Sequence, residues 1–345
     1  MKRNPRIKRS YALVAHGPNV VELRQGVWNT VAFTLTDDGG QGKLYEVLRS
    51  LDGTQGTARI ASDHGMKTAE IEALVDHLDS LGVLEDGPAS ALDYYLSESI
   101  TSLRAVGDET PAVKRVILLG DEQLTTPIRE LLAKTLPTLA VEVPEADDSA
   151  RTVIEKSSAE SLLKGLDYEA AVAGCESWRD ALVVYAQATL RPDRLTVLNR
   201  VARGAGFWWM NVALDGAFLL VGPTFNPNDG PCYECLDTRV LMNVRDSYTY
   251  QDYKNALHQH RVKHGDVPVL PAISGVLAAH AALEICNLVV AGANFTAGQL
   301  LSIYLPTMAF VYHELLQVPG CSGCGASSER DDVELYFDLR ALAGG

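Results

Sequence analysis

Two Cys-x-x-Cys pairs, Cys232 with Cys235 and Cys321 with Cys324, constrain the fold of this 345-residue chain more than any other feature. Each pair presents two thiolates on a tight turn, and Gly and Pro residues flank both pairs. Two such pairs brought together form a tetrahedral four-thiolate zinc site with no open position for water or substrate. We therefore predict a structural zinc that ties a late loop to the C-terminal end of a folded domain. Four free thiols, or two disulfides in a secreted protein, are the alternatives.

The bulk composition is that of a globular protein long enough for two domains. Hydrophobic residues make up 47% of the chain, which is enough to bury a sizeable core. The formal net charge of -14 argues against a nucleic-acid partner, because phosphates need a broad basic face. Six cysteines in so long a chain do not form a disulfide scaffold, so a cytoplasmic location is expected.

Two segments bear on targeting and membranes. The basic N-terminal tip has no apolar core behind it, so no signal peptide is expected. The longest apolar stretch, residues 270–291, contains Ser274, His280, Glu284 and Asn287. We interpret it as a buried helix, and no membrane partner is expected.

Residues 1–87 are predicted to form a compact unit of three strands followed by three helices. Residues 30–35 alternate in a period of two, and turn residues separate the strands. The third helix has the clearest pattern, with Thr68 as N-cap and Gly82 after its end, and an extended wing follows it. The predicted strands are residues 12–15, 20–23 and 30–35, and the predicted helices are residues 44–51, 57–61 and 68–81. This order is typical of a winged-helix-like domain.

The negative charge of the third helix argues against DNA as a ligand of this unit. Its polar side carries Glu70, Glu72, Asp76 and Asp79, which would repel the phosphates of DNA. An accessory domain without a ligand is one interpretation. A peptide clamp is the other, because an edge strand beside a helix lets an extended peptide add as a further strand through main-chain hydrogen bonds.

A helical connector is predicted at residues 88–110, and a second domain at residues 111–345. There, strands alternate with helices, which indicates an α/β fold with a parallel sheet. The predicted strands are residues 116–119, 140–143, 170–173, 207–212 and 217–221. A long helix is predicted from about residue 271 to 288, and a hairpin at residues 300–305 and 309–315 leads to the second cysteine pair.

The first turn of this sheet bears on nucleotide binding. It begins with Gly120 and lacks the repeated glycines that bring a backbone close to phosphate. Asp121 and Glu122 place two carboxylates where the phosphate would lie, at an unfavourable like-charge energy. We therefore predict that this chain does not bind ATP, and we interpret Gly120 as part of an ordinary tight turn.

Other candidate sites have weaker support. His258, His260 and His264 could form a second metal site, but nearby cations favour a solvated loop. Cys175 and Cys286 are interpreted as buried thiols, because no adjacent histidine indicates a nucleophile. No arrangement typical of a catalytic site stands out.

The flanks of the cysteine pairs carry a resemblance to a known family. The second domain resembles the Rossmann-type ThiF-like adenylating enzymes, and more closely their degenerate branch in azole-forming peptide biosynthesis, at residues 222–223, 230–239 and 321–325. Residues 1–87 resemble the PqqD-like element that recognises leader peptides, at residues 51–53 and 81–86. Together the two parts resemble the ocin-ThiF-like, leader-binding partner of a YcaO cyclodehydratase.

The resemblance implies a division of labour. The first domain binds the leader of a ribosomal precursor peptide, and the second docks the YcaO cyclodehydratase, which uses ATP to form azolines in bacteriocin or thiopeptide biosynthesis. A homodimer is expected, and independent catalysis by this chain is not. The expected leader contacts are Thr30, Val31, Ala32, Phe33, Thr34, Leu74, Val75 and Leu78.

Two other functions stay open on the sequence. One is an enzyme that itself adenylates a peptide carboxylate, as intact ThiF-like relatives do. The other is a winged-helix DNA-binding regulator, which the acidic third helix disfavours.

Overall fold

The computed structural model describes residues 4–28, 31–85, 90–96, 113–163 and 165–325. The chain divides into two compact units, Met1–Ile100 and Thr101–Gly345, and each has its own hydrophobic core. Most of the predicted connector lies outside the described residues. Its described part contains a short helix, α4 (Ala91–Tyr94).

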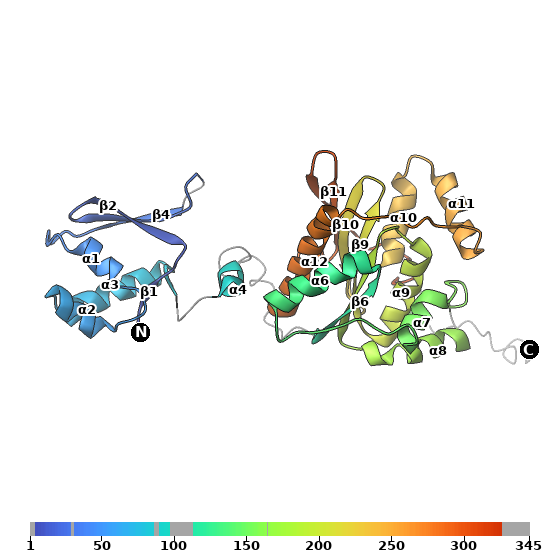
Figure 1. Cartoon of the computed structure of the whole chain (residues 1–345), viewed down its shortest axis with the longest axis horizontal. Helices are drawn as coiled ribbons and strands as arrows, with labels where there is room; N and C mark the ends of the chain where they lie inside the picture. The colour runs from blue at the N-terminus through green and yellow to red at the C-terminus, as the bar shows by residue number, and fades with distance from the viewer. Residues whose placement is uncertain (1–3, 29–30, 86–89, 97–112, 164, 326–345) are drawn as a thin grey trace, which may run out of the picture. The chain divides into compact units, whose positions relative to one another are not determined.

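A three-stranded antiparallel sheet opens the first unit. β2 (Tyr11–Gly17), β3 (Val20–Gln25) and β4 (Val31–Thr36) pair in that order, so β2 and β4 are edge strands. Three helices follow in the predicted order and lie on one side of this sheet (Figure 1): α1 (Leu44–Arg49), α2 (Thr57–His64) and α3 (Thr68–Ser80). The core between sheet and helices includes Leu23, Leu48 and Ile71, each fully buried.

Two details of the first unit differ from the prediction. The extended segment after α3 is a strand, β5 (Leu84–Glu85), which pairs antiparallel with an additional strand, β1 (Arg6–Ile7). The N-cap of α3 is Lys67 rather than Thr68, and the Glu70 carboxylate accepts a hydrogen bond from the Lys67 backbone N–H at 3.1 Å. A carboxylate in the first turn replaces the expected threonine hydroxyl as the acceptor for an unpaired N–H.

A seven-stranded sheet, in the order β12-β11-β10-β9-β8-β6-β7, forms the centre of the second unit. Four neighbouring strands are parallel: β7 (Ala140–Glu142), β6 (Arg115–Gly120), β8 (Ala181–Gln187) and β9 (Trp208–Asp215). Antiparallel pairing continues the sheet through β10 (Phe218–Phe225), β11 (Gln299–Tyr304) and β12 (Ala309–Glu314). The α/β class is confirmed, and the predicted parallel sheet extends into the β9–β10 and β11–β12 hairpins, whose loops are too short for a crossover.

Helices cover both faces of this sheet (Figure 1). α6 (Glu122–Thr135) packs with α12 (Pro271–Ala291) on one face. The remaining helices of the unit are α7 (Ser149–Lys156), α8 (Leu166–Gly174), α9 (Pro192–Ala205), α10 (Tyr233–Asn243), α11 (Ser247–His258) and a short 3-10 turn, η2 (Glu176–Trp178). By length and composition α12 could cross a membrane, but Leu277, Ala281 and Ile285 are fully buried, as in the core helix that the sequence predicts.

The prediction of a strand at residues 170–173 is wrong. These residues belong to α8, which has Asp167 and Glu169 in its first turn, where carboxylates favour a helix. The third parallel strand is instead β8, and every one of its residues is buried. A short apolar run does not by itself distinguish a strand from a buried helix.

Candidate functional site

The structure brings the four cysteines of the two pairs together. Their sulfur atoms all lie within 4.8 Å of one another, with 3.7 Å between Cys232 and Cys321 and 3.4 Å between Cys235 and Cys324. Tetrahedral coordination with Zn–S bonds of about 2.3 Å separates sulfur atoms by about 3.8 Å. The donor set and its spacing therefore fit a metal ion of this kind.

The surroundings of the cluster suit thiolates. The backbone N–H groups of Val318 and Gly323 point at the sulfurs of Cys235 and Cys321, at 3.3 and 3.4 Å. Cys232 is also the N-cap of α10, where the helix dipole favours negative charge. Burial raises the pKa of the Cys235 thiol to about 11, so a bound cation is needed to hold this sulfur as thiolate at neutral pH.

Polar contacts fix the first pair to α9. Asn199 accepts a hydrogen bond from the Tyr233 backbone N–H at 2.9 Å, and Arg200 forms a 2.8 Å ion pair with Glu234. The Ser322 hydroxyl donates to the same Glu234 carboxylate, which links the second pair to the first. All four cysteines belong to the buried core, so the site is closed to substrate.

Gly120 has a packing reason to be glycine. Its φ is 112°, and a Cβ atom here would lie 1.9 Å from the Ala186 carbonyl oxygen. The Asp121 carboxylate accepts a hydrogen bond from the Ala188 backbone N–H, and so it lies at the turn where a phosphate would bind. The close approach of β6 to the end of β8 thus accounts for this glycine without a nucleotide.

The space above this turn is small. Its volume is about 190 Å³, below the usual range of ligand pockets, and its lining includes Asp121, Asp266, Arg191 and His264. The Gln123 side chain holds the loop before α12 beside this space through two hydrogen bonds. It accepts from the Val269 backbone N–H at 2.9 Å and donates to the Val267 carbonyl at 3.3 Å.

In the part of the first unit that the structure describes, β4 is an edge strand, and no strand pairs with its outer side. The Asp37 backbone N–H donates to Asn19 on the β3 side, and antiparallel pairing alternates the direction of backbone groups. The N–H groups of Ala32, Thr34 and Thr36 therefore point to the open side. These three side chains are exposed, whereas Phe33 and Leu35 turn toward the core.

The predicted leader contacts differ in accessibility. Val31, Ala32 and Thr34 are exposed, and Phe33 and Leu74 are half-buried against the same core. Val75 and Leu78 are at most 1% exposed and serve the packing of α3. Thr30 lies outside the described residues. Beyond the predicted set, Trp28 precedes β4 in the chain and is 99% exposed. No sequence pattern singles it out as a peptide contact.

The other candidates behave as buried or separate groups. In the described part of the chain, the four cysteines are the only close group of three or more potential metal ligands, so the three histidines do not gather. Burial raises the pKa of Cys175 to about 12 and of Cys286 to about 11, as expected for inert thiols. Sequence reasoning missed a large cavity over β9 and β10, because its lining residues are scattered between positions 188 and 313.

The fold is similar to that of two solved heterocyclases and of E. coli MccB. The heterocyclase TruD is 22% identical, with a TM-score of 0.63 over 94% of this chain and 43% of TruD. A heterocyclase solved with substrate and cofactor is 18% identical, with a TM-score of 0.62 over 95% of this chain and 40% of its own. E. coli MccB with ATP is 13% identical, with a TM-score of 0.52 over 93% of this chain and 99% of MccB.

These similarities establish the fold. The chain spans less than half the length of the two heterocyclases and nearly all of MccB, and in each case both units contribute to the match. No protein-family model matches the sequence, and no curated protein matches it.

Proposed function

We propose that this protein binds the leader of a ribosomally made precursor peptide and presents it to a separate YcaO cyclodehydratase. The observation that carries the proposal is β4, an edge strand with exposed side chains and outward N–H groups. A peptide that adds to β4 as a fourth strand gains main-chain hydrogen bonds, and Phe33 and Leu74 give it apolar contacts. The shared fold with two heterocyclases supports this role, as does the PqqD-like, winged-helix order of the first unit.

In this proposal the ThiF-like second unit is a scaffold that does not use ATP. Gly120 is explained by its close packing against the Ala186 carbonyl, and the Asp121 carboxylate occupies the turn where a phosphate would bind. We assign a structural zinc to Cys232, Cys235, Cys321 and Cys324, since four buried thiolates satisfy its coordination and leave no reactive position. When bound, zinc supplies the positive charge that keeps the buried sulfurs as thiolates.

The direct test is fluorescence anisotropy with a labelled leader of a precursor encoded beside a YcaO enzyme. Saturable binding to the full chain is expected, and an unlabelled leader should displace the probe. A failure to saturate overturns the proposal. Azoline formation by the YcaO enzyme on the same precursor should increase when this chain is added.

A second function has support from the similarity to MccB, whose structure is solved with ATP and which this chain matches over nearly its whole length. It is the adenylation of a peptide carboxylate by this chain. Precursor-dependent exchange of pyrophosphate into ATP by the purified protein would establish it. We expect no exchange, because Asp121 and Asp266 line the small space above the turn.

We also propose a cytoplasmic homodimer. β12 is the edge of the seven-stranded sheet, and its apolar residues Phe310, Val311 and Tyr312 are 46–49% exposed. A second copy that covers this edge would remove apolar surface from water. Light scattering after size-exclusion chromatography measures the mass, and Val311→Lys is expected to shift a dimer toward monomer.

A further inference from the structure

A large cavity lies on the face of the second unit's sheet and adjoins the small space above Gly120, with which it shares Ala188, Thr189 and Val267. Its volume is about 810 Å³, within the range of small-molecule and peptide side-chain sites. Strands β9, β10 and β11 form its floor, and α9, α10 and α11 contribute its walls. We call it the sheet-face cavity; its apolar lining includes Leu190, Leu195, Leu220, Leu236, Val240 and Leu300.

Most polar groups of this cavity are already paired. The Asn211 amide accepts from Gln187 at 3.1 Å and donates to the Gly222 carbonyl at 3.3 Å. The Ser302 hydroxyl lies 2.7 Å from the His313 ring. At the opposite wall, Asp237 accepts from the Tyr250 hydroxyl at 2.7 Å and from Lys254 at 2.6 Å, so its charge is balanced. These groups can orient a ligand but leave no cation to attract an anion.

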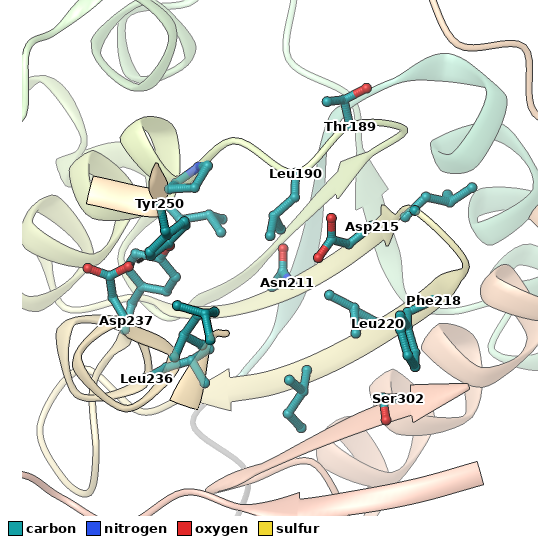
Figure 2. Close-up of a pocket in the computed structure, with 18 of the residues that line it drawn as sticks. Thr189, Leu190, Asn211, Asp215, Phe218, Leu220, Leu236, Asp237, Tyr250 and Ser302 are labelled. Atoms are coloured by element: carbon teal, nitrogen blue, oxygen red, sulfur yellow. Dashed lines mark hydrogen bonds between the residues drawn. The ribbon is translucent and has the colours of Figure 1, made fainter. Parts of the chain in front are cut away.

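Asp215 differs from these paired polar groups of the cavity. It ends β9 beside the two-residue turn to β10, it is exposed to solvent, and its carboxylate points toward the interior of the cavity (Figure 2). No hydrogen bond or ion pair within the described residues engages it. Burial of the two phenols is the main cause that raises the pKa of Tyr250 and of Tyr253, which line the same cavity. The negative charge of Asp215 adds to this rise, after Asp237 at Tyr250 and after Asp193 at Tyr253. Its field therefore acts inside the cavity.

We propose that the sheet-face cavity binds an apolar ligand that carries one positive charge, with its cation at Asp215 and its apolar part against Leu190, Leu220 and Leu236. Burial of the apolar part provides most of the affinity, and the unpaired carboxylate selects the charge. Nucleotides and free carboxylates are rejected, because the lining offers no free cation within the described residues. The site lies in the second unit and does not depend on leader binding by the first.

Two sources supply this chemistry: an apolar peptide segment with a lysine or arginine, and a small alkyl amine. Four probes separate them by titration calorimetry with the full chain. They are octylammonium, octanoate, and the capped peptides acetyl-Leu-Leu-Lys-amide and acetyl-Leu-Leu-Glu-amide. At least one cation is expected to bind about tenfold more tightly than its anionic counterpart, as a charge-assisted contact predicts. Preference for the lysine peptide identifies a peptide segment, and binding of octylammonium alone identifies a small amine.

Two variants test whether Asp215 causes the preference for a cation and whether the probes bind in the sheet-face cavity. Asp215→Asn should reduce the preference for the cation to less than about threefold, while Asp252→Asn, an exposed carboxylate on α11 outside the cavity, should leave it unchanged. Leu220→Trp fills the cavity and should abolish binding of every probe; circular dichroism checks that each variant is folded. The proposal is overturned if neither cation binds, if cation and anion bind equally, or if Asp215→Asn retains the full preference.

Discussion

The sulfur atoms of Cys232 and Cys321 lie 3.7 Å apart, although 89 residues separate them in the sequence. The segment between them contains α10, α11, α12 and the β11–β12 hairpin. A metal held by both cysteines therefore closes a long loop that includes one wall of the sheet-face cavity. Cross-links of long loops stabilise a fold by restricting its unfolded chain.

We expect about one zinc per chain, and its loss in Cys232→Ser and in Cys321→Ser. Removing a structural metal site costs at least about 3 kcal/mol, which lowers the melting temperature of a unit this size by roughly 10 °C. Elemental analysis and thermal unfolding measure the two effects. Cys175→Ala, a buried cysteine outside the cluster, should keep the metal. Wild-type protein without stoichiometric zinc would contradict the assignment.

Thr34→Pro should weaken leader binding at least about tenfold, because proline removes an outward N–H from the β4 edge without touching the β3–β4 ladder. Fluorescence anisotropy measures the affinity. Ala15→Pro is the matched control, since it alters an exposed residue of the opposite edge strand, β2. Equal affinities for Thr34→Pro and wild type would exclude β4 as the docking edge.

Gly120→Ala should destabilise the second unit by more than about 3 kcal/mol, because the new Cβ meets the Ala186 carbonyl oxygen at 1.9 Å and the φ of 112° is strained. Gly206→Ala is the control. It also has a positive φ, 77°, but its Cβ meets nothing closer than 3.6 Å, so a loss of about 1 kcal/mol is expected. Urea unfolding compares them. Similar small losses in both variants would show that Gly120 is not required by packing.

Acid should weaken the second unit through Asp193. Burial disfavours its charged form, but hydrogen bonds from Arg191 and Arg194 outweigh burial and lower its pKa from 3.8 to about 2. A lowered folded-state pKa gives stability that is present above pH 4 and is lost as pH falls toward 2, about 2 kcal/mol in all.

Urea unfolding at pH 5 and pH 3 tests this expectation. The wild-type protein should lose about 1 kcal/mol more between these two values than Asp193→Asn does. Asp147→Asn, an exposed carboxylate outside the network, should keep the wild-type dependence. A pH dependence that Asp193→Asn leaves unaltered would place the acid sensitivity elsewhere.

Local patterns account for much of what the sequence predicted. The alternation at residues 30–35 and the periodicity after Thr68 correspond to β4 and α3, because each pattern reports which side of its own element is buried. The run at residues 170–173 misled, since an apolar segment of four fits a strand and a buried helix equally well. β8 went unpredicted, because a strand buried on both faces shows no alternation.

The sequence by itself determined the α/β class and the two pairs of cysteines and predicted the order of the two domains, because spacing and periodicity are local properties of a chain. Only the tertiary structure decided that the four sulfurs converge, that β4 is an open edge and that Gly120 faces the Ala186 carbonyl. It alone placed Asp215 and Tyr250 in one cavity. Such distances depend on how strands and helices pack over long separations, which no local pattern encodes.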